Sequence, residues 1–158
     1  MAFDAFLKID GIPGESPDAK HKDEIQLESF SWGATQTGTM AFGGGGGSGK
    51  VAMQDFHFVM KANKASPKLL LTCATGEHIK KAVLTCRKAG KDQQDYYKVT
   101  LTDVLVSSYQ AGGGGDLPTD QISLNFAKVE FEYAPQNEKG ALGTAVKVGY
   151  DLKLSKMV

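Results

Sequence analysis

The sequence is poor in cysteine and proline, and it has no excess of either charge. It holds two cysteines and five prolines among 158 residues, and its 18 Lys and Arg are balanced by 18 Asp and Glu. Cys73 and Cys86 match no zinc or redox spacing, so we expect reduced thiols. A chain without net charge has no long-range electrostatic attraction to phosphate groups. We therefore expect neither binding to nucleic acid nor insertion into a membrane.

Long apolar runs are also absent. No stretch approaches the roughly 18 apolar residues of a membrane-spanning helix. The first ten residues are interrupted by Asp4 and Lys8, unlike a secretory signal peptide. With 41% hydrophobic residues the chain can build its own core. We therefore expect a single domain over residues 1–158 that is made and folded in the cytoplasm.

What the sequence does have is alternation of apolar and polar residues with a period of two. Phe3, Ala5, Leu7 and Ile9 share one parity, and residues 146–154 alternate in the same way. This pattern predicts half-buried β-strands. Similar runs occupy residues 24–38, 51–60, 80–89, 95–109 and 120–133. The predicted fold class is therefore mainly β.

Three of the predicted strands switch parity midway. The switches fall between Leu27 and Phe30, between Leu101 and Val104, and between Phe126 and Val129. A phase shift of one residue turns the following side chains to the other face, and a β-bulge at the switch would restore the pattern and bend the strand. Three bends predict a sheet that curls into a β-barrel, or strands that turn a corner between two sheets.

Residues 66–76 interrupt the alternation and predict one short α-helix. Ser66 can cap the N-terminus, Pro67 suits the first helical position, and Gly76 can adopt the left-handed conformation that ends a helix. The expected buried face consists of Leu69, Leu70, Cys73 and Ala74.

Ten of the nineteen glycines gather in two segments, which predicts two long glycine-rich loops over residues 39–50 and 110–119. Gly44, Gly49 and Lys50 match the first part of a phosphate-binding loop. That motif needs Ser or Thr after the lysine and a helix beyond it, whereas Val51 and a predicted strand follow here. Nucleotide binding is therefore not expected.

No combination of residues predicts an enzyme, a cofactor or a metal site. His21, His57 and His78 are isolated, and no Gly-x-Ser-x-Gly motif is present. His57 alternates with two phenylalanines, which favours a surface or interface position. Asp55 and Asp103 lie in predicted strands, where each carboxylate needs a partner, most simply a structural one.

Several segments in a fixed order resemble the hemolysin-coregulated protein (Hcp) family. They are residues 2–15, the Ser31–Gly33 segment, the glycine loop followed by residues 51–56, the helix start at Ser66 and Pro67, and residues 86–90, 104–108 and 124–129. No single segment is very specific, but the ordered set spans residues 2–152.

The resemblance implies an inner-tube protein of the bacterial type VI secretion system, with a fold like that of phage tail-tube proteins. It implies homohexameric rings that stack into a tube inside a contractile sheath, with a spike protein at the tip. It also implies small effector proteins carried in the ring lumen, assembly in the cytoplasm, and secretion through the apparatus without a signal peptide. A tube subunit needs no cofactor and is not an enzyme.

Two surfaces of such a tube can be assigned from parity and loop length. If Phe30, Trp32 and Ala34 face the core, the opposite face is small and uncharged. The lumen-facing residues are then predicted to be Ser31, Gly33, Thr35 and Thr37. The loop predicted to contact an adjacent ring or a partner consists of Phe42, Gly43, Gly44, Gly45, Gly46, Gly47, Ser48, Gly49 and Lys50.

A second interpretation remains open from the residues alone. The chain could be a monomeric β-sandwich module that binds carbohydrate or another ligand. Such a site would use exposed aromatic side chains, and Tyr96, Tyr97 and Tyr109 are its only candidates.

Overall fold

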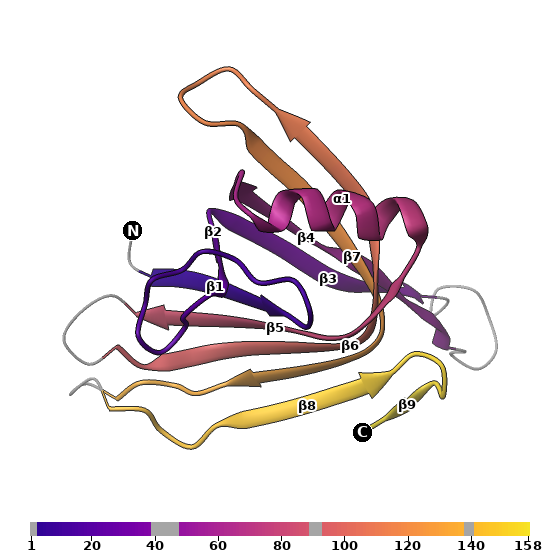
Figure 1. The fold of residues 1–158 in the computed structure, drawn as a ribbon. Helices are drawn as coiled ribbons and strands as arrows, with labels where there is room; N and C mark the ends of the chain where they lie inside the picture. Colours follow the sequence, from indigo (N-terminus) through magenta and orange to yellow (C-terminus); the bar gives the residue numbers. More distant parts are fainter. Residues whose placement is uncertain (1–2, 39–47, 89–92, 138–140) are drawn as a thin grey trace.

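A computed structural model describes residues 3–38, 48–88, 93–137 and 141–158 of the chain (Figure 1), and the structural statements below concern these residues. They form nine strands and one helix. The elements are β1 (Phe3–Ile9), β2 (Ile25–Leu27), β3 (Ser29–Gly38), β4 (Ser48–Lys61), α1 (Ala65–Thr75), β5 (His78–Lys88), β6 (Asp95–Gly112), β7 (Thr119–Tyr133), β8 (Val146–Asp151) and β9 (Lys156–Met157). The prediction of a mainly β fold with one short helix is confirmed.

The strands form one ladder in the order β2-β1-β5-β6-β7-β4-β3, with β8 added to β7 and β9 to β8. Strand β6 pairs with β7 from Tyr97 to Gly112. On the other edge of β7, β4 pairs with residues 119–124 and β8 pairs with residues 128–133. The long strands β6 and β7 therefore belong to two sheets, and Figure 1 shows both strands bending between them.

The bend lies where the sequence switches parity. In β6 the buried side chains stand at odd positions up to Leu101 and at even positions from Val104 onward. The pairing passes from Thr102 opposite Lys128 to Val104 opposite Phe126, so neither strand gains a residue. The predicted bulge is therefore wrong at this position, because Asp103 turns the strand through a left-handed backbone with φ of 57°. The register shift in this ladder falls a little further on, between Val106 and Ser108.

The first switch, between Leu27 and Phe30, separates β2 from β3 at Glu28. Strand β2 pairs with β1, whereas β3 pairs with β4, so the two ends of the ladder are consecutive in the chain. The Glu28 N–H donates to the carbonyl oxygen of Val59 at 2.8 Å. Among the described strands the ladder does not close into a complete barrel by pairing. The continuous chain through Glu28 links its two ends instead.

The space between the sheets is filled by aliphatic and aromatic side chains. Phe6, Phe56, Phe58, Leu7, Ile25 and Met60 are among the largest that are fully buried. Trp32 packs edge-on against Phe131, with ring centroids 5.2 Å apart, and its Nε1–H donates to the Tyr97 hydroxyl at 3.0 Å. These contacts join β3 to the start of β6 and to the end of β7.

Helix α1 lies across one side of the sheets in Figure 1. Its predicted end is confirmed, since Gly76 is left-handed and its N–H donates to Thr72 O at 3.0 Å. The predicted cap is wrong, because Asn63 Oδ1 accepts from the Ala65 N–H at 2.8 Å. Ser66 instead donates to the buried Asp120 carboxylate at 2.5 Å.

The bond from Ser66 also sets which face of α1 is buried. The buried residues are Ala65, Ser66, Leu69 and Thr72. Leu70 and Ala74, which the sequence predicts on the buried face, are exposed. Turning Ser66 inward toward Asp120 places residues three and six positions further along on the same side of the helix, and Leu70 then points outward.

Two loop predictions change in length. Strand β6 reaches Gly112 and β7 begins at Thr119, so the second glycine loop spans only residues 113–118. Most of the first loop, residues 39–47, lies outside the described residues. Strand β8 ends at Asp151, three residues earlier than predicted, and the chain turns back into β9, which the sequence pattern did not indicate.

Residues 13–24, here called the strap, cross the end of β1 and β5 and are held there by ion pairs. Arg87 in β5 is 3% exposed and donates to both Asp18 carboxylate oxygens at 2.7 and 2.8 Å. The His21 ring stacks on Phe6, with centroids 4.5 Å apart, and its nitrogens lie 2.9 and 3.1 Å from Glu24 and Asp95. The strap is therefore fixed by polar contacts rather than by a strand ladder.

We expect Gly14→Ala to destabilise the fold at the start of the strap. The Gly14 N–H donates to Asp23 O at 2.7 Å, and an added Cβ would lie 2.6 Å from the carbonyl oxygen of Glu24. Displacing the backbone should lower the free energy of unfolding by about 1–3 kcal/mol in a urea titration. Gly38→Ala is the matched control, since nothing lies within 4 Å of its added Cβ. Equal effects of the two changes would contradict this explanation.

Candidate functional site

One face of β3, β4, β6 and β7 is covered by small polar side chains and is here called the polar face. Ser31 is paired with His57, and His57 with Ser123, so these three side chains form a row across three strands. The polar face consists of Ser31, Gly33, Thr35, Thr37, Asp55, His57, Ser107, Ser123 and Asn125.

Asp55 supplies the fixed negative charge of the polar face. Ser107 donates to one carboxylate oxygen at 2.6 Å, and Asn125 Nδ2 donates to the other at 2.9 Å. The expectation that this carboxylate has structural partners is confirmed. Asp103 is likewise paired, with Lys153 at 2.6 Å and His78 at 3.1 Å, and the hydrogen bond from Lys153 lowers the pKa of Asp103.

His57 is half-buried between these groups, and its Nδ1 lies 3.1 Å from Ser123 Oγ. Asp55 bonds Ser107 and Asn125 rather than His57, so no carboxylate orients the imidazole as in a catalytic triad. Within the described residues, no group of three or more His, Cys, Asp or Glu side chains could hold a metal ion. The arrangement is suited to holding another surface by weak hydrogen bonds.

The structure places the residues predicted to face the lumen on this polar face. Ser31, Thr35 and Thr37 are exposed, and Gly33 is half-buried opposite Gln54. Of the residues predicted on the opposite face, Phe30 and Trp32 pack against the core. Ala34 is exposed, so its predicted burial is wrong. The alternation in β3 does not show at which residue the opposite sheet stops covering this strand.

Of the loop predicted to contact an adjacent ring, residues 42–47 lie outside the described residues. Ser48, Gly49 and Lys50 begin β4, and Lys50 is exposed. A strand thus follows Lys50, as the sequence predicts, in place of the helix that a phosphate-binding loop requires.

Sequence reasoning missed an uncovered apolar surface, here called the apolar seam, formed by Tyr133, Val146 and Val148. These side chains are 45%, 65% and 61% exposed. Val146 is paired with Tyr133, and Val148 with Phe131, so the seam continues the core-facing side of its sheet. Alternation identifies the apolar face of β8, but it does not show that no described residue covers that face.

The tyrosines of the ligand-binding interpretation pack against the core rather than forming an exposed aromatic surface. Tyr96, Tyr97 and Tyr109 are all half-buried, and burial raises the pKa of each hydroxyl. Both cysteines are free thiols, as expected, and burial raises the pKa of Cys86 to about 12. In the described part of the chain, α1 is too short and too polar to cross a bilayer.

Comparisons with known proteins place the chain in a family. The family model described as "Type VI secretion system effector, Hcp" matches residues 6–133. Protein hcp1 of Pseudomonas aeruginosa is 45% identical over 157 residues, which cover 97% of each chain.

Solved structures agree with this match. The crystal structure of Hcp1 from Salmonella typhimurium covers 100% of both chains at 38% identity with a TM-score of 0.84. A structure described as a type six secretion system protein covers 99% of this chain and 100% of its own at 32% identity, with a TM-score of 0.94. The resemblance drawn from the ordered sequence segments is thereby confirmed, and the chain belongs to the Hcp family of type VI secretion tube proteins.

Proposed function

We propose that the chain is a structural subunit of the type VI secretion inner tube. Six copies form a ring, and rings stack into a tube with a spike protein at its tip. A contractile sheath propels the tube, and small effectors travel in its lumen. The subunit assembles in the cytoplasm and leaves through the apparatus without a signal peptide. It performs no chemistry of its own.

The apolar seam is the observation that carries this proposal. Three large side chains at 45–65% exposure, continuous with the core-facing side of a sheet, are typical of a surface that another chain covers. In the described residues β3 pairs with β4 alone, so its other edge is also free. A closed ring needs two different surfaces on each copy, and the seam and the β3 edge lie on different strands.

Electron microscopy of the purified chain tests ring formation directly. Negatively stained particles should show six-fold rings with an open centre. Particles of a single subunit, or closed two-fold dimers, would contradict the proposal.

The polar face supports the second part of the proposal, the carriage of effectors. Its hydroxyls and amide form hydrogen bonds, but it has little apolar area with which to bind a cargo tightly. Such a surface can retain a protein in a narrow lumen and still release it.

A bulky charge at Ser31 should therefore impair cargo retention without breaking the ring. Ser31→Glu places an unpaired carboxylate beside His57 and near Asp55. We expect about tenfold less of a co-expressed type VI effector to co-purify with tagged rings, which corresponds to a loss of about 1.4 kcal/mol. Thr144→Glu, an exposed position outside the polar face, is the control. Loss of rings, or unchanged retention, would show that Ser31 does not line the lumen.

A further inference from the structure

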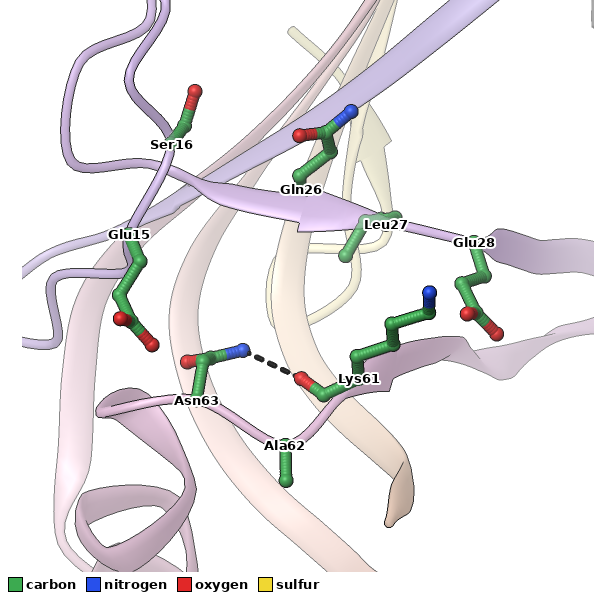
Figure 2. A pocket seen from close by; sticks show the side chains of 8 residues that line it. All are labelled: Glu15, Ser16, Gln26, Leu27, Glu28, Lys61, Ala62 and Asn63. Carbon is green, nitrogen blue, oxygen red and sulfur yellow. Dashed lines mark hydrogen bonds between the residues drawn. The ribbon is translucent and has the colours of Figure 1, made fainter. Parts of the chain in front are cut away.

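A polar pocket opens where β2 and the end of β4 diverge (Figure 2). Strand β2 pairs with β1, whereas β4 pairs with β3 and β7, and the pocket between β2 and the end of β4 has a volume of about 400 Å³. Its polar lining includes Glu15 and Ser16 from the strap, Glu28 from the junction of β2 and β3, Lys61 from the end of β4, and Asn63 from the segment that follows β4.

The pocket has an excess of negative charge. Figure 2 shows Glu15 and Glu28 on opposite sides of it, with Lys61 and Asn63 between them. Glu15 accepts one hydrogen bond, from the Lys64 N–H at 3.0 Å. Neither Glu28 nor Lys61 is in an ion pair with another described residue. Two carboxylates against one ammonium favour the entry of a further cation.

An unmatched cation lies at the other end of the same strand. Lys50 is exposed near the start of β4, and no described residue forms an ion pair with it. Lys50 and Lys61 are eleven positions apart in β4. At about 3.3 Å per residue, the two ends of the strand are separated by roughly 35 Å. One subunit thus presents a cation at one end of β4 and an acidic pocket at the other.

We propose that in stacked rings the Lys50 ammonium of one subunit enters this pocket in a subunit of the adjacent ring and pairs with Glu28 and Glu15. Head-to-tail stacking of identical copies brings opposite ends of the subunit together, so each copy would both donate a lysine and receive one. Six such contacts between two rings act together, and each is weakened by salt. The inference rests on the proposed function, because it requires rings that stack.

A mixing experiment with isotopes tests the contact without any substitution. Preformed rings of ordinary and of 15N-labelled protein are mixed at tube-forming concentration and treated with a carbodiimide, which joins a touching ammonium and carboxylate. We expect heavy–light peptide pairs joining Lys50 to Glu28 or Glu15. Heavy–light pairs that join Lys50 to other carboxylates, or tubes that yield no pair from Lys50, would overturn the proposal.

Exchanging the charges of Lys50 and Glu28 tests the same contact independently, with tube length as the readout. Lys50→Glu and Glu28→Lys should each shorten tubes in electron micrographs about tenfold, and the double variant should regain most of the length. Lys22→Glu, an exposed strap residue outside the pocket, is the control. Single variants with tubes of normal length, or a double variant without recovery, would also overturn the contact. A native mass below that of the ring would instead count against the proposed function.

Discussion

Val148→Glu should convert the assembled protein into folded monomers. Val148 is 61% exposed in the isolated subunit, so a glutamate there costs the monomer little. If the apolar seam is covered in the ring, the same carboxylate is buried against an apolar surface without a partner, which costs several kcal/mol at each contact. A sizing column coupled to light scattering should show one subunit mass in place of six, while circular dichroism retains the strand signal.

Lys147→Glu is the matched control, because it places the same side chain on the other face of β8. Lys147 pairs with Glu130 at 3.5 Å, and replacing this partly exposed ion pair by two like charges should lower stability by about 1 kcal/mol. We expect its rings to remain intact. A folded Val148→Glu protein that still forms hexamers would show that the seam is not the subunit contact.

Arg87→Met should cause a large loss of monomer stability. The guanidinium is 3% exposed and holds the strap through Asp18, with Asp4 at 3.6 Å and the Phe6 ring at 5.0 Å. Without it, two carboxylates lose their cation. Fully buried pairs lose about 3–5 kcal/mol when one partner is removed, but both carboxylates here are partly solvated, so about 2–3 kcal/mol is expected from urea titrations. Lys153→Met, which breaks the exposed pair with Asp103, should cost far less.

The same ion pair gives the stability a pH dependence with a definite sign. The hydrogen bonds from Arg87 hold the pKa of Asp18 well below its usual value. The unfolded chain therefore binds this proton first as the pH falls, and the stabilisation is full above the ordinary Asp pKa of about 3.9 and is lost below it. Asp18→Asn should be less stable than the natural chain at pH 7 and should lose less stability between pH 5 and 2. Asp103 and Glu130, whose pKa values are also lowered, maintain a residual slope.

Local patterns in the sequence predict the strands and the places where they bend. The parity switches at residues 27–30, 101–104 and 126–129 all coincide with corners, because burial on one face selects apolar residues and a corner changes that face. The patterns do not distinguish a bulge from the left-handed turn at Asp103. Nor do they show that the ladder ends at β2 and β3, since strand order is a long-range property.

The functional surfaces were predictable only in part. The small residues of β3 indicate one polar strand face, but their partners His57 and Ser123 come from strands far along the chain. The pairing of Arg87 with Asp18 spans 69 positions and has no local signal. Ser66 lies within α1 rather than at its N-cap, which is Lys64, and its hydroxyl binds Asp120, 54 positions away in the sequence. In each case the role of a residue depends on a partner that is far away in the sequence.

The native mass of the purified, reduced protein tests the central claim most directly. Native mass spectrometry at micromolar concentration should give six copies of the 16.9 kDa chain, about 101 kDa. That mass would agree with a ring-forming subunit and would justify the tests of Ser31, Lys50 and Val148. A stable monomer at the same concentration would contradict the account, since its apolar seam would then remain uncovered in solution.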